Sequence, residues 1–314
     1  MGVMTNSWEA LDHKLKPEYN QVGGHEGVGE VAKLGPGVDE TDVIKVGKRV
    51  GVKWVAGVCG RCEACYQGAE SCCPNQKISG YFTPGTFQQY VLAPANYATP
   101  IPDGLDSADA APMLCAGLTT YSALRKSNTQ PGDWVVISGA GGGLGHLAVQ
   151  IAARGMNLRV IAVDAGHKDE FVKKCGAEHF FDVLKLDGTQ LAEKVKEVTG
   201  GRMAKAVIVC TAANVAYEQG LGLLGFNGTL VCVGIPEHKR EPIKSADPAK
   251  IVMTQLRIVG SAVGTQWEAL QVLDMAARGQ IKSSHRIEKL ENLTKVFEEM
   301  EGGKLQGRVV LDLQ

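Results

Sequence analysis

Four cysteines crowd into one short run of this chain, C-G-R-C-E-A-C-Y-Q-G-A-E-S-C-C-P, in which they occupy Cys59, Cys62, Cys65 and Cys73. Tetrahedral zinc favours four thiolates, and two intervening residues allow consecutive ligands to curl around one ion. The alternative is a disulfide cluster, but 314 residues, nine cysteines and no secretory leader do not favour it. The spacing therefore predicts a closed, structural zinc site.

Composition excludes several classes of partner. The chain has a net charge of −1 and 44% apolar residues, with no long basic run and no segment that approaches a membrane span. We therefore expect a small-molecule substrate, and neither nucleic acid nor a membrane. Thiols in this number, without a leader, favour a reducing, cytoplasmic location.

The length and the changing pattern predict an α/β protein of two domains. Residues 1–115 are rich in Gly, Val and Pro, with short strand-like runs at 49–55 and 87–92, which predicts a β-barrel interrupted by the cysteine lobe. Residues 116–262 alternate apolar strands with amphipathic helices, which predicts a parallel sheet covered on both faces. Residues 263–314 add two helices and a strand and return to the first domain.

A glycine-rich turn lies between a strand and a helix in the run V-V-I-S-G-A-G-G-G-L-G-H-L-A-V. Its glycines allow a sharp bend and a close approach of the backbone, and the helix start offers N–H donors to a pyrophosphate. Asp164 follows Gly145 by nineteen positions at the end of the next strand, where a carboxylate accepts hydrogen bonds from an adenosine ribose. A carboxylate also repels a 2′-phosphate, so the pattern predicts NAD and tighter binding of NADH than of NADPH. The alternative is that Asp164 only caps the following helix.

Two further residues are typical ligands of catalytic zinc, His25 in G-G-H-E and Cys115 in A-P-M-L-C-A-G. Taken alone, a loop histidine and a buried cysteine are more often structural. Their separation in sequence does not pair them.

Together, these motifs and S-G-Y at 79–81, F-Q-Q-Y at 87–90 and S-G-A-G-G-G-L-G at 138–145 resemble the zinc-dependent medium-chain alcohol dehydrogenases, in particular the yeast-type branch. The resemblance covers nearly the whole chain from Gly23 onward. It implies a GroES-like barrel over 1–115, a Rossmann NAD-binding domain over 116–262 and a return to the catalytic domain over 263–314. It also implies a homo-oligomer, a dimer or a tetramer.

The resemblance implies roles for individual residues. Cys59, Cys62, Cys65 and Cys73 match the family's structural zinc site, with Cys72 as a neighbour only. His25 and Cys115 match ligands of the catalytic zinc, Glu26 matches an acidic residue that ligates it in some states, and Trp54 matches a wall of the alcohol pocket. The matched NAD contacts are Gly142, Gly143, Leu144, Asp164, Lys168, Val233, Ile235, Ser261 and Val263. Arg308 is similar to a basic residue near the family's carboxyl end.

The front of the chain departs from the family pattern. Family members carry a β-rich segment that ends in G-V-C-H-T-D or a similar run, whereas this chain begins M-G-V-M-T-N-S. Met4 would then stand where the family has a zinc-ligating cysteine, and a thioether is a poor ligand for zinc. Asn6 would stand at the proton-relay position, with Thr5 and Ser7 as neighbouring hydroxyls. We therefore expect a barrel without its first strands and about one firmly held zinc ion per chain.

Three functions are compatible with the sequence. The first is a zinc- and NAD-dependent oxidoreductase that interconverts primary or secondary alcohols with aldehydes or ketones. The second is a truncated, catalytically impaired NAD-binding member with only the structural zinc intact. The third, a zinc-independent reductase of the same fold, is disfavoured by the cysteine lobe, His25 and Cys115. We adopt the first interpretation, the zinc- and NAD-dependent oxidoreductase.

Overall fold

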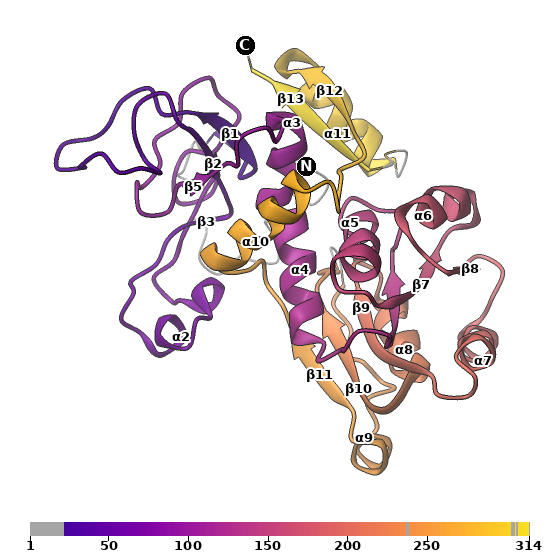
Figure 1. Ribbon diagram of the computed structural model, residues 1–314. Coiled ribbons are helices and arrows are strands. Elements are labelled where there is room, and N and C mark those ends of the chain that lie inside the picture. The colour runs from indigo at the N-terminus through magenta and orange to yellow at the C-terminus, as the bar shows by residue number, and fades with distance from the viewer. Residues whose placement is uncertain (1–21, 237–238, 303–304, 306, 314) are drawn as a thin grey trace. The chain divides into compact units, whose positions relative to one another are not determined.

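The computed structural model describes residues 22–236, 239–302, 305 and 307–313 (Figure 1). The chain divides into two compact units. The first contains the described residues up to Leu118 and those from Val263 onward, and the second is Thr119–Ala262. The division falls within helix α4 (Ala116–Lys126), three residues beyond the boundary that the sequence pattern suggests.

The first unit contains small antiparallel sheets. A three-stranded sheet has the order β1-β2-β5 and a two-stranded sheet pairs β3 with β4; the bounds are β1 Gly27–Glu30, β2 Arg49–Val52, β3 Val55–Gly57, β4 Lys77–Ile78 and β5 Thr99–Pro100. β2 is packed closely from the side, because a Cβ on Gly51 would lie 2.6 Å from a methyl of Leu114. The strand-like run expected at 49–55 forms two strands in the structure, β2 and β3, which are separated by Lys53 and Trp54.

The prediction of a strand at 87–92 is wrong. The structure has no strand there, and the side chains of Tyr90 and Leu92 are 79% and 91% exposed. Apolar residues stabilise a strand when one of its faces is buried, and among the described residues Tyr90 and Leu92 are not covered in this way.

Helices and a second two-stranded sheet complete the first unit. They are α2 (Glu63–Tyr66), α3 (Ser107–Ala110), α10 (Gln266–Ala277), α11 (Leu293–Glu301) and the parallel pair β12 (His285–Lys289) and β13 (Arg308–Asp312). α10 begins at a capping box in which Thr265 accepts from the N–H of Glu268 and the Glu268 side chain accepts from the N–H of Thr265.

The second unit is a six-stranded parallel sheet with the order β11-β10-β9-β6-β7-β8 (Figure 1). Its strands are β6 (Trp134–Ser138), β7 (Arg159–Asp164), β8 (His179–Asp182), β9 (Ala204–Val209), β10 (Leu224–Cys232) and β11 (Arg257–Gly260). The chain moves outward from β6 through β7 to β8 and then crosses back to β9 on the other side of β6. The carboxyl ends of β6 and β9 therefore flank the topological switch point, where ligands bind in open α/β sheets.

Helices pack on both faces of this sheet. They are α5 (Gly145–Gln150), which continues as a π-helical turn over Ile151–Gly155, α6 (Asp169–Cys175), α7 (Gly188–Val198), α8 (Asn214–Gly220) and α9 (Pro248–Thr254). Val136, Val163 and Val207 share a core cluster with Leu191 of α7 and Tyr217 of α8. The intervening residues of the strands are equally buried and face the opposite side, because side chains alternate along a strand.

Among the described residues, no helix is both long enough and apolar enough to cross a lipid bilayer.

Candidate functional site

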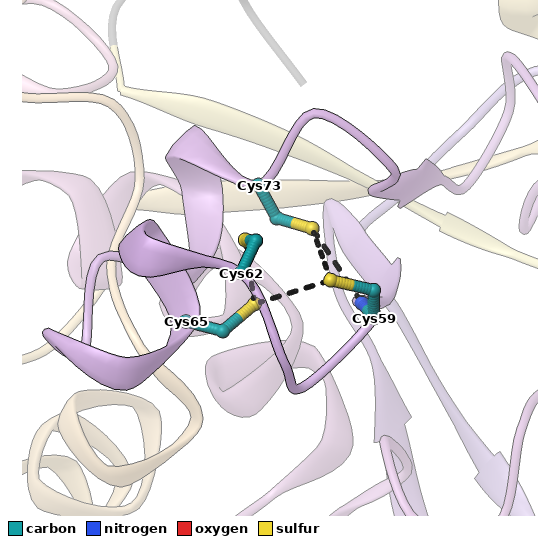
Figure 2. Close-up of side chains that lie close together, drawn as sticks. All are labelled: Cys59, Cys62, Cys65 and Cys73. Carbon is teal, nitrogen blue, oxygen red and sulfur yellow. Dashed lines mark hydrogen bonds between the residues drawn. The ribbon is translucent and has the colours of Figure 1, made fainter.

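The four cysteines of the lobe come together around one point (Figure 2). Their sulfur atoms all lie within 4.8 Å of one another, with 3.5 Å between Cys62 and Cys65, 3.6 Å between Cys59 and Cys73 and 4.0 Å between Cys59 and Cys65. α2 carries Cys65, while Cys73 follows a 3-10 turn over Glu70–Cys72. Cys72 is exposed and outside the group.

This donor set fits zinc. Thiolates at about 2.3 Å from a tetrahedral ion lie about 3.8 Å apart, which is close to each of these separations. The backbone supports the thiolate form of Cys59, because the N–H of Arg61 is the main cause that lowers the pKa of Cys59 to about 6, whereas burial raises the pKa of Cys65 to about 12 in the absence of an ion. The N–H of Cys59 also donates to the sulfur of Cys73 over 3.5 Å.

His25 and Cys115 also meet, although 90 residues separate them in the chain. The Nε2 atom of His25 lies 3.2 Å from the Sγ atom of Cys115. A nitrogen and a sulfur that share one tetrahedral zinc lie about 3.5 Å apart, so this pair also fits the ion. Burial lowers the pKa of His25 to about 4, which leaves the imidazole neutral and its lone pair available to a metal.

Both carboxylate oxygens of Glu26 accept hydrogen bonds. One of its oxygens accepts from Arg308 and the other accepts from the N–H of Ala116 over 3.2 Å. Burial opposes ionisation of the Glu26 carboxyl, but Arg308, His25 and the Ala116 N–H together hold its pKa below the usual range. Both oxygens of Glu26 therefore already have partners in this structure.

Aromatic side chains surround the histidine. Trp54 packs edge-on against His25 at 4.6 Å and against Tyr81 at 5.0 Å, measured between ring centroids. Val263 belongs to this unit and packs in a cluster with Trp54 and Cys115. It has a φ of +40°, a conformation that a β-branched residue rarely adopts. The structure thus places Val263 beside the expected metal ligands in the first unit.

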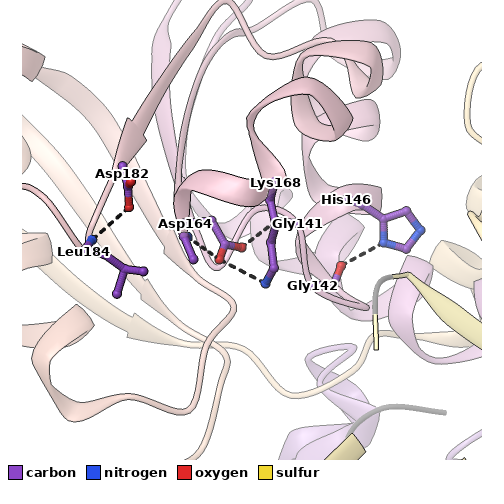
Figure 3. A network of polar contacts seen from close by, with 8 residues as sticks. Gly141, Gly142, His146, Asp164, Lys168, Asp182 and Leu184 are labelled. Atoms are coloured by element: carbon purple, nitrogen blue, oxygen red, sulfur yellow. Dashed lines mark hydrogen bonds and ion pairs between the residues drawn. The ribbon is translucent and has the colours of Figure 1, made fainter. Parts of the chain in front are cut away.

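The second unit holds the glycine-rich turn and its carboxylate (Figure 3). Asp164 accepts from the N–H of Gly141 over 2.7 Å, from the N–H of Ala165 over 2.7 Å and from Lys168 Nζ over 3.1 Å. The alkyl part of Lys168 covers Gly141, where a Cβ would lie 2.6 Å from its Cδ atom. Asp164 therefore braces the turn from the end of β7, and it does not cap a helix: the following α6 begins without a side-chain cap.

The turn leads directly into α5. Gly142, Gly143 and Leu144 precede the helix, and the imidazole of His146 donates through Nδ1 to the carbonyl of Gly142 over 2.9 Å (Figure 3). Gly145 has no room for a side chain, because a Cβ there would lie 2.0 Å from the carbonyl oxygen of Gly139.

The remaining expected cofactor residues of this unit lie at the carboxyl edge of the sheet. Val233 and Ile235 follow β10, and Ser261 follows β11. Ser261 accepts a hydrogen bond from Lys126 over 3.2 Å. Met4, Thr5, Asn6 and Ser7, on which the expectations about the first ligand and the proton relay rest, lie outside the described residues.

Comparison with known proteins places these sites in a family. The alcohol dehydrogenase GroES-like domain matches residues 1–103, and the zinc-binding dehydrogenase domain matches residues 143–278. Alcohol dehydrogenase 2 of Emericella nidulans is 58% identical over 317 residues, which cover 99% of this chain and 86% of that protein. The chain belongs to the zinc-dependent medium-chain alcohol dehydrogenases.

Solved structures of other alcohol dehydrogenases and reductases share the GroES-like and Rossmann architecture. The alcohol dehydrogenase of the archaeon Aeropyrum pernix is 27% identical with a TM-score of 0.84, over 96% of this chain and 86% of that one. Acetophenone reductase from Geotrichum candidum, solved in complex with NAD, is 28% identical with a TM-score of 0.83, over 99% and 87% of the two chains. Zinc and NAD are the cofactors of this alcohol dehydrogenase family member.

Three structural features of this dehydrogenase chain could not be predicted from the spacing of residues in the sequence. They are the ion pair between Glu26 and Arg308, the buried amine of Lys53 and the hydrogen bond from Tyr217 to Gly234. Each joins residues that are far apart in the chain or unremarkable alone. For Lys53, the sequence offered one signal of burial, which is its position inside the apolar run G-V-K-W.

Proposed function

We propose that this chain oxidises primary or secondary alcohols to aldehydes or ketones with NAD, and catalyses the reverse reduction, at His25 and Cys115. The observation that carries the proposal is the separation of 3.2 Å between His25 Nε2 and Cys115 Sγ, where the imidazole also packs against Trp54. When bound, zinc supplies a Lewis acid that acidifies the alcohol, and NAD accepts the hydride.

The chain's own residues prepare this chemistry. Burial keeps His25 neutral, so that it offers a lone pair rather than a proton. Arg308 and the Ala116 N–H hold Glu26 ionised beside the two ligands, and the Arg308 guanidinium balances the charge of that carboxylate. Trp54 and Tyr81 supply apolar surface that excludes water from the substrate.

The cysteine lobe has a separate role in this proposal. Cys59, Cys62, Cys65 and Cys73 form a closed set of four thiolates, which leaves no coordination position for substrate. Glu70 of the lobe accepts from the N–H of Gln266 at the start of α10. The lobe therefore stabilises the first unit, and we assign it no part in the reaction.

The experiment compares Cys115→Ser with Cys72→Ser, because Cys72 is exposed and outside both groups of sulfurs. We expect Cys115→Ser to lower ethanol oxidation by at least about a thousandfold and to abolish the binding of a second, weakly held zinc ion beyond the one held firmly by the lobe, since serine is a far poorer zinc ligand than a thiolate. Cys72→Ser should retain both. Full activity of Cys115→Ser would contradict the proposal, and a wild-type chain that holds only the lobe's zinc would favour the catalytically impaired alternative.

We also propose a cytoplasmic homo-oligomer, with a second copy bound at the outer edge of β11. β11 ends the parallel sheet and pairs only with β10 among the described strands. Val252 and Met253 of α9, 72% and 79% exposed, and Ile258 of β11, 39% exposed, give this edge an apolar surface. An unpaired, apolar edge readily associates with another strand. None of the nine cysteines is in a disulfide, which supports the reducing compartment.

Light scattering coupled to gel filtration tests the oligomer. Ile258→Lys places a charge in the edge, so it should reduce the assembly to smaller species at micromolar concentration. Ile287→Lys is the matched control, because Ile287 is 60% exposed in β12 of the other unit. An unchanged mass for Ile258→Lys would contradict this edge as the interface.

A further inference from the structure

Tyr217 is a buried tyrosine of the dinucleotide unit. It belongs to α8, its side chain packs in the core cluster beneath the sheet, and 8% of the residue is exposed. Its hydroxyl donates to the carbonyl oxygen of Gly234, two residues beyond the end of β10. A hydroxyl from a helix thus holds one peptide group at the carboxyl edge of the sheet.

Gly234 is held from its other side as well. Its N–H donates to the carbonyl of Val209 over 2.9 Å. A Cβ at Gly234 would lie 2.2 Å from the carbonyl oxygen of Thr211, and a Cβ at Gly139 would lie 3.1 Å from Cβ of the same threonine. The segments that follow β6, β9 and β10 therefore pack backbone against backbone, and the Tyr217 hydroxyl fixes the outermost of them.

The sheet topology assigns this edge to one half of a dinucleotide. The two nucleotides of the cofactor lie on opposite sides of the switch point between β6 and β9. Asp164, at the end of β7, is on the side where a carboxylate accepts from the adenosine ribose. Gly234 follows β10 and is on the other side, which leaves it to the nicotinamide half. The adjacent Ile235 is 53% exposed and offers an apolar face to a flat ring.

We propose that Tyr217 is a positioning residue for the nicotinamide half of the cofactor. Its hydroxyl fixes the peptide between Gly234 and Ile235, and so fixes the direction in which Ile235 faces the ring. Without it, Gly234 keeps its N–H bond to Val209 and its packing against Thr211, but its carbonyl loses the hydrogen bond that holds its direction. This inference rests on the proposed function of the unit as an NAD-binding domain.

The experiment measures binding of two ligands, NADH and AMP, to Tyr217→Phe by isothermal titration calorimetry. Phenylalanine keeps the packed ring and removes only the hydroxyl. We expect the Kd for NADH to rise about fivefold, within the range for one lost hydrogen bond, while the Kd for AMP changes less than about twofold. Ile235→Ala, which truncates an exposed side chain and so leaves folding intact, should show the same selectivity. Tyr90→Phe is the control, because Tyr90 is 79% exposed in the other unit and should change neither.

The outcomes separate positioning from general support. Unchanged NADH affinity in Tyr217→Phe would overturn the inference. Equal losses for NADH and AMP, with a lower unfolding temperature, would show that Tyr217 only supports the unit as a whole, and would also overturn it. A wild-type chain that binds no NADH would instead overturn the proposed function, whatever the variants do.

Discussion

Lys53 is a lysine whose amine is buried in the protein interior. It is 2% exposed, its Nζ atom donates to the carbonyl of Tyr97 over 2.6 Å and to the hydroxyl of Thr99 over 3.1 Å, and it lies 4.8 Å from the centroid of the Tyr97 ring. Burial lowers the pKa of Lys53 from 10.5 to about 8, against the opposing effect of Glu70. The partners are all acceptors, and they do not fully replace the water that the ammonium loses.

This pKa gives a pH dependence of stability with a definite sign. Between the folded pKa and the higher unfolded pKa, the unfolded chain keeps the Lys53 proton and the folded chain has released it, so the free energy of unfolding rises with pH. We expect the difference between the wild type and Lys53→Met to shift by about 2 kcal/mol in favour of the wild type from about pH 7 to about pH 9.5. Urea denaturation at a series of pH values measures it.

Lys77 is the matched control for Lys53. It is an exposed lysine in β4 of the same unit, so Lys77→Met removes a lysine without changing the protein interior. A pH-independent difference for Lys53→Met would contradict the buried, depressed lysine.

The element that the sequence describes most fully is the turn that joins β6 to α5. Gly145 opens α5 directly against the carbonyl of Gly139, and Asp164 and His146 brace the same turn with hydrogen bonds. Gly145 is required because two backbones approach closely there. The positive φ of this turn belongs to Gly139.

Gly145→Ala tests the close packing of this turn. A methyl group 2.0 Å from the Gly139 carbonyl forces the turn to move, and we expect a loss of NADH affinity of at least about tenfold and of stability by about 2 kcal/mol. Gly222→Ala is the control in the same unit, because nothing lies within 4 Å of its Cβ position. It should be neutral or slightly stabilising. Fluorescence titration with NADH and urea denaturation measure both, and equal behaviour of the two variants would contradict the packing argument.

The cysteine lobe and the strand prediction at 87–92 show why some elements were predictable. The lobe needs only local spacing, since all four ligands lie within fifteen consecutive residues. The central strands, such as β6 at 134–138, are buried on both faces and appear as continuous apolar runs, which is why the sequence predicted a parallel sheet within 116–262. The segment at 87–92 has a strand-like composition but pairs with no strand of the described residues and leaves Tyr90 and Leu92 exposed, which composition alone does not reveal.

At the scale of the whole molecule, the two proposed kinds of ligand belong to different units. The cysteine lobe, His25 and Cys115 are in the first, and the glycine-rich turn with Asp164 is in the second. A ligand that binds only the folded form stabilises the unit that holds it, by about 2.7 kcal/mol at a hundred times its Kd. Zinc and NADH should therefore stabilise the two units separately.

Differential scanning calorimetry tests this separation. We expect NADH at about a hundred times its Kd to raise one unfolding transition by roughly 5 to 10 °C. A zinc chelator should lower the other transition. Cys73→Ser, which removes one ligand of the lobe, should already show the lowered transition and respond little to the chelator. A single transition that both treatments move equally would contradict two separately stabilised units.

The sequence by itself determined the α/β architecture, the thiolate lobe and the dinucleotide turn, because each depends on residues that are neighbours in the chain or repeat at the period of a helix or strand. The tertiary structure alone decided which distant residues meet. It brings His25 to Cys115 across 90 positions, Glu26 to Arg308 across 282 and Tyr217 to Gly234 across 17. Such pairs depend on the path of the chain between elements and on the burial that holds the two residues together. The spacing of residues in the sequence predicts neither the path nor the burial.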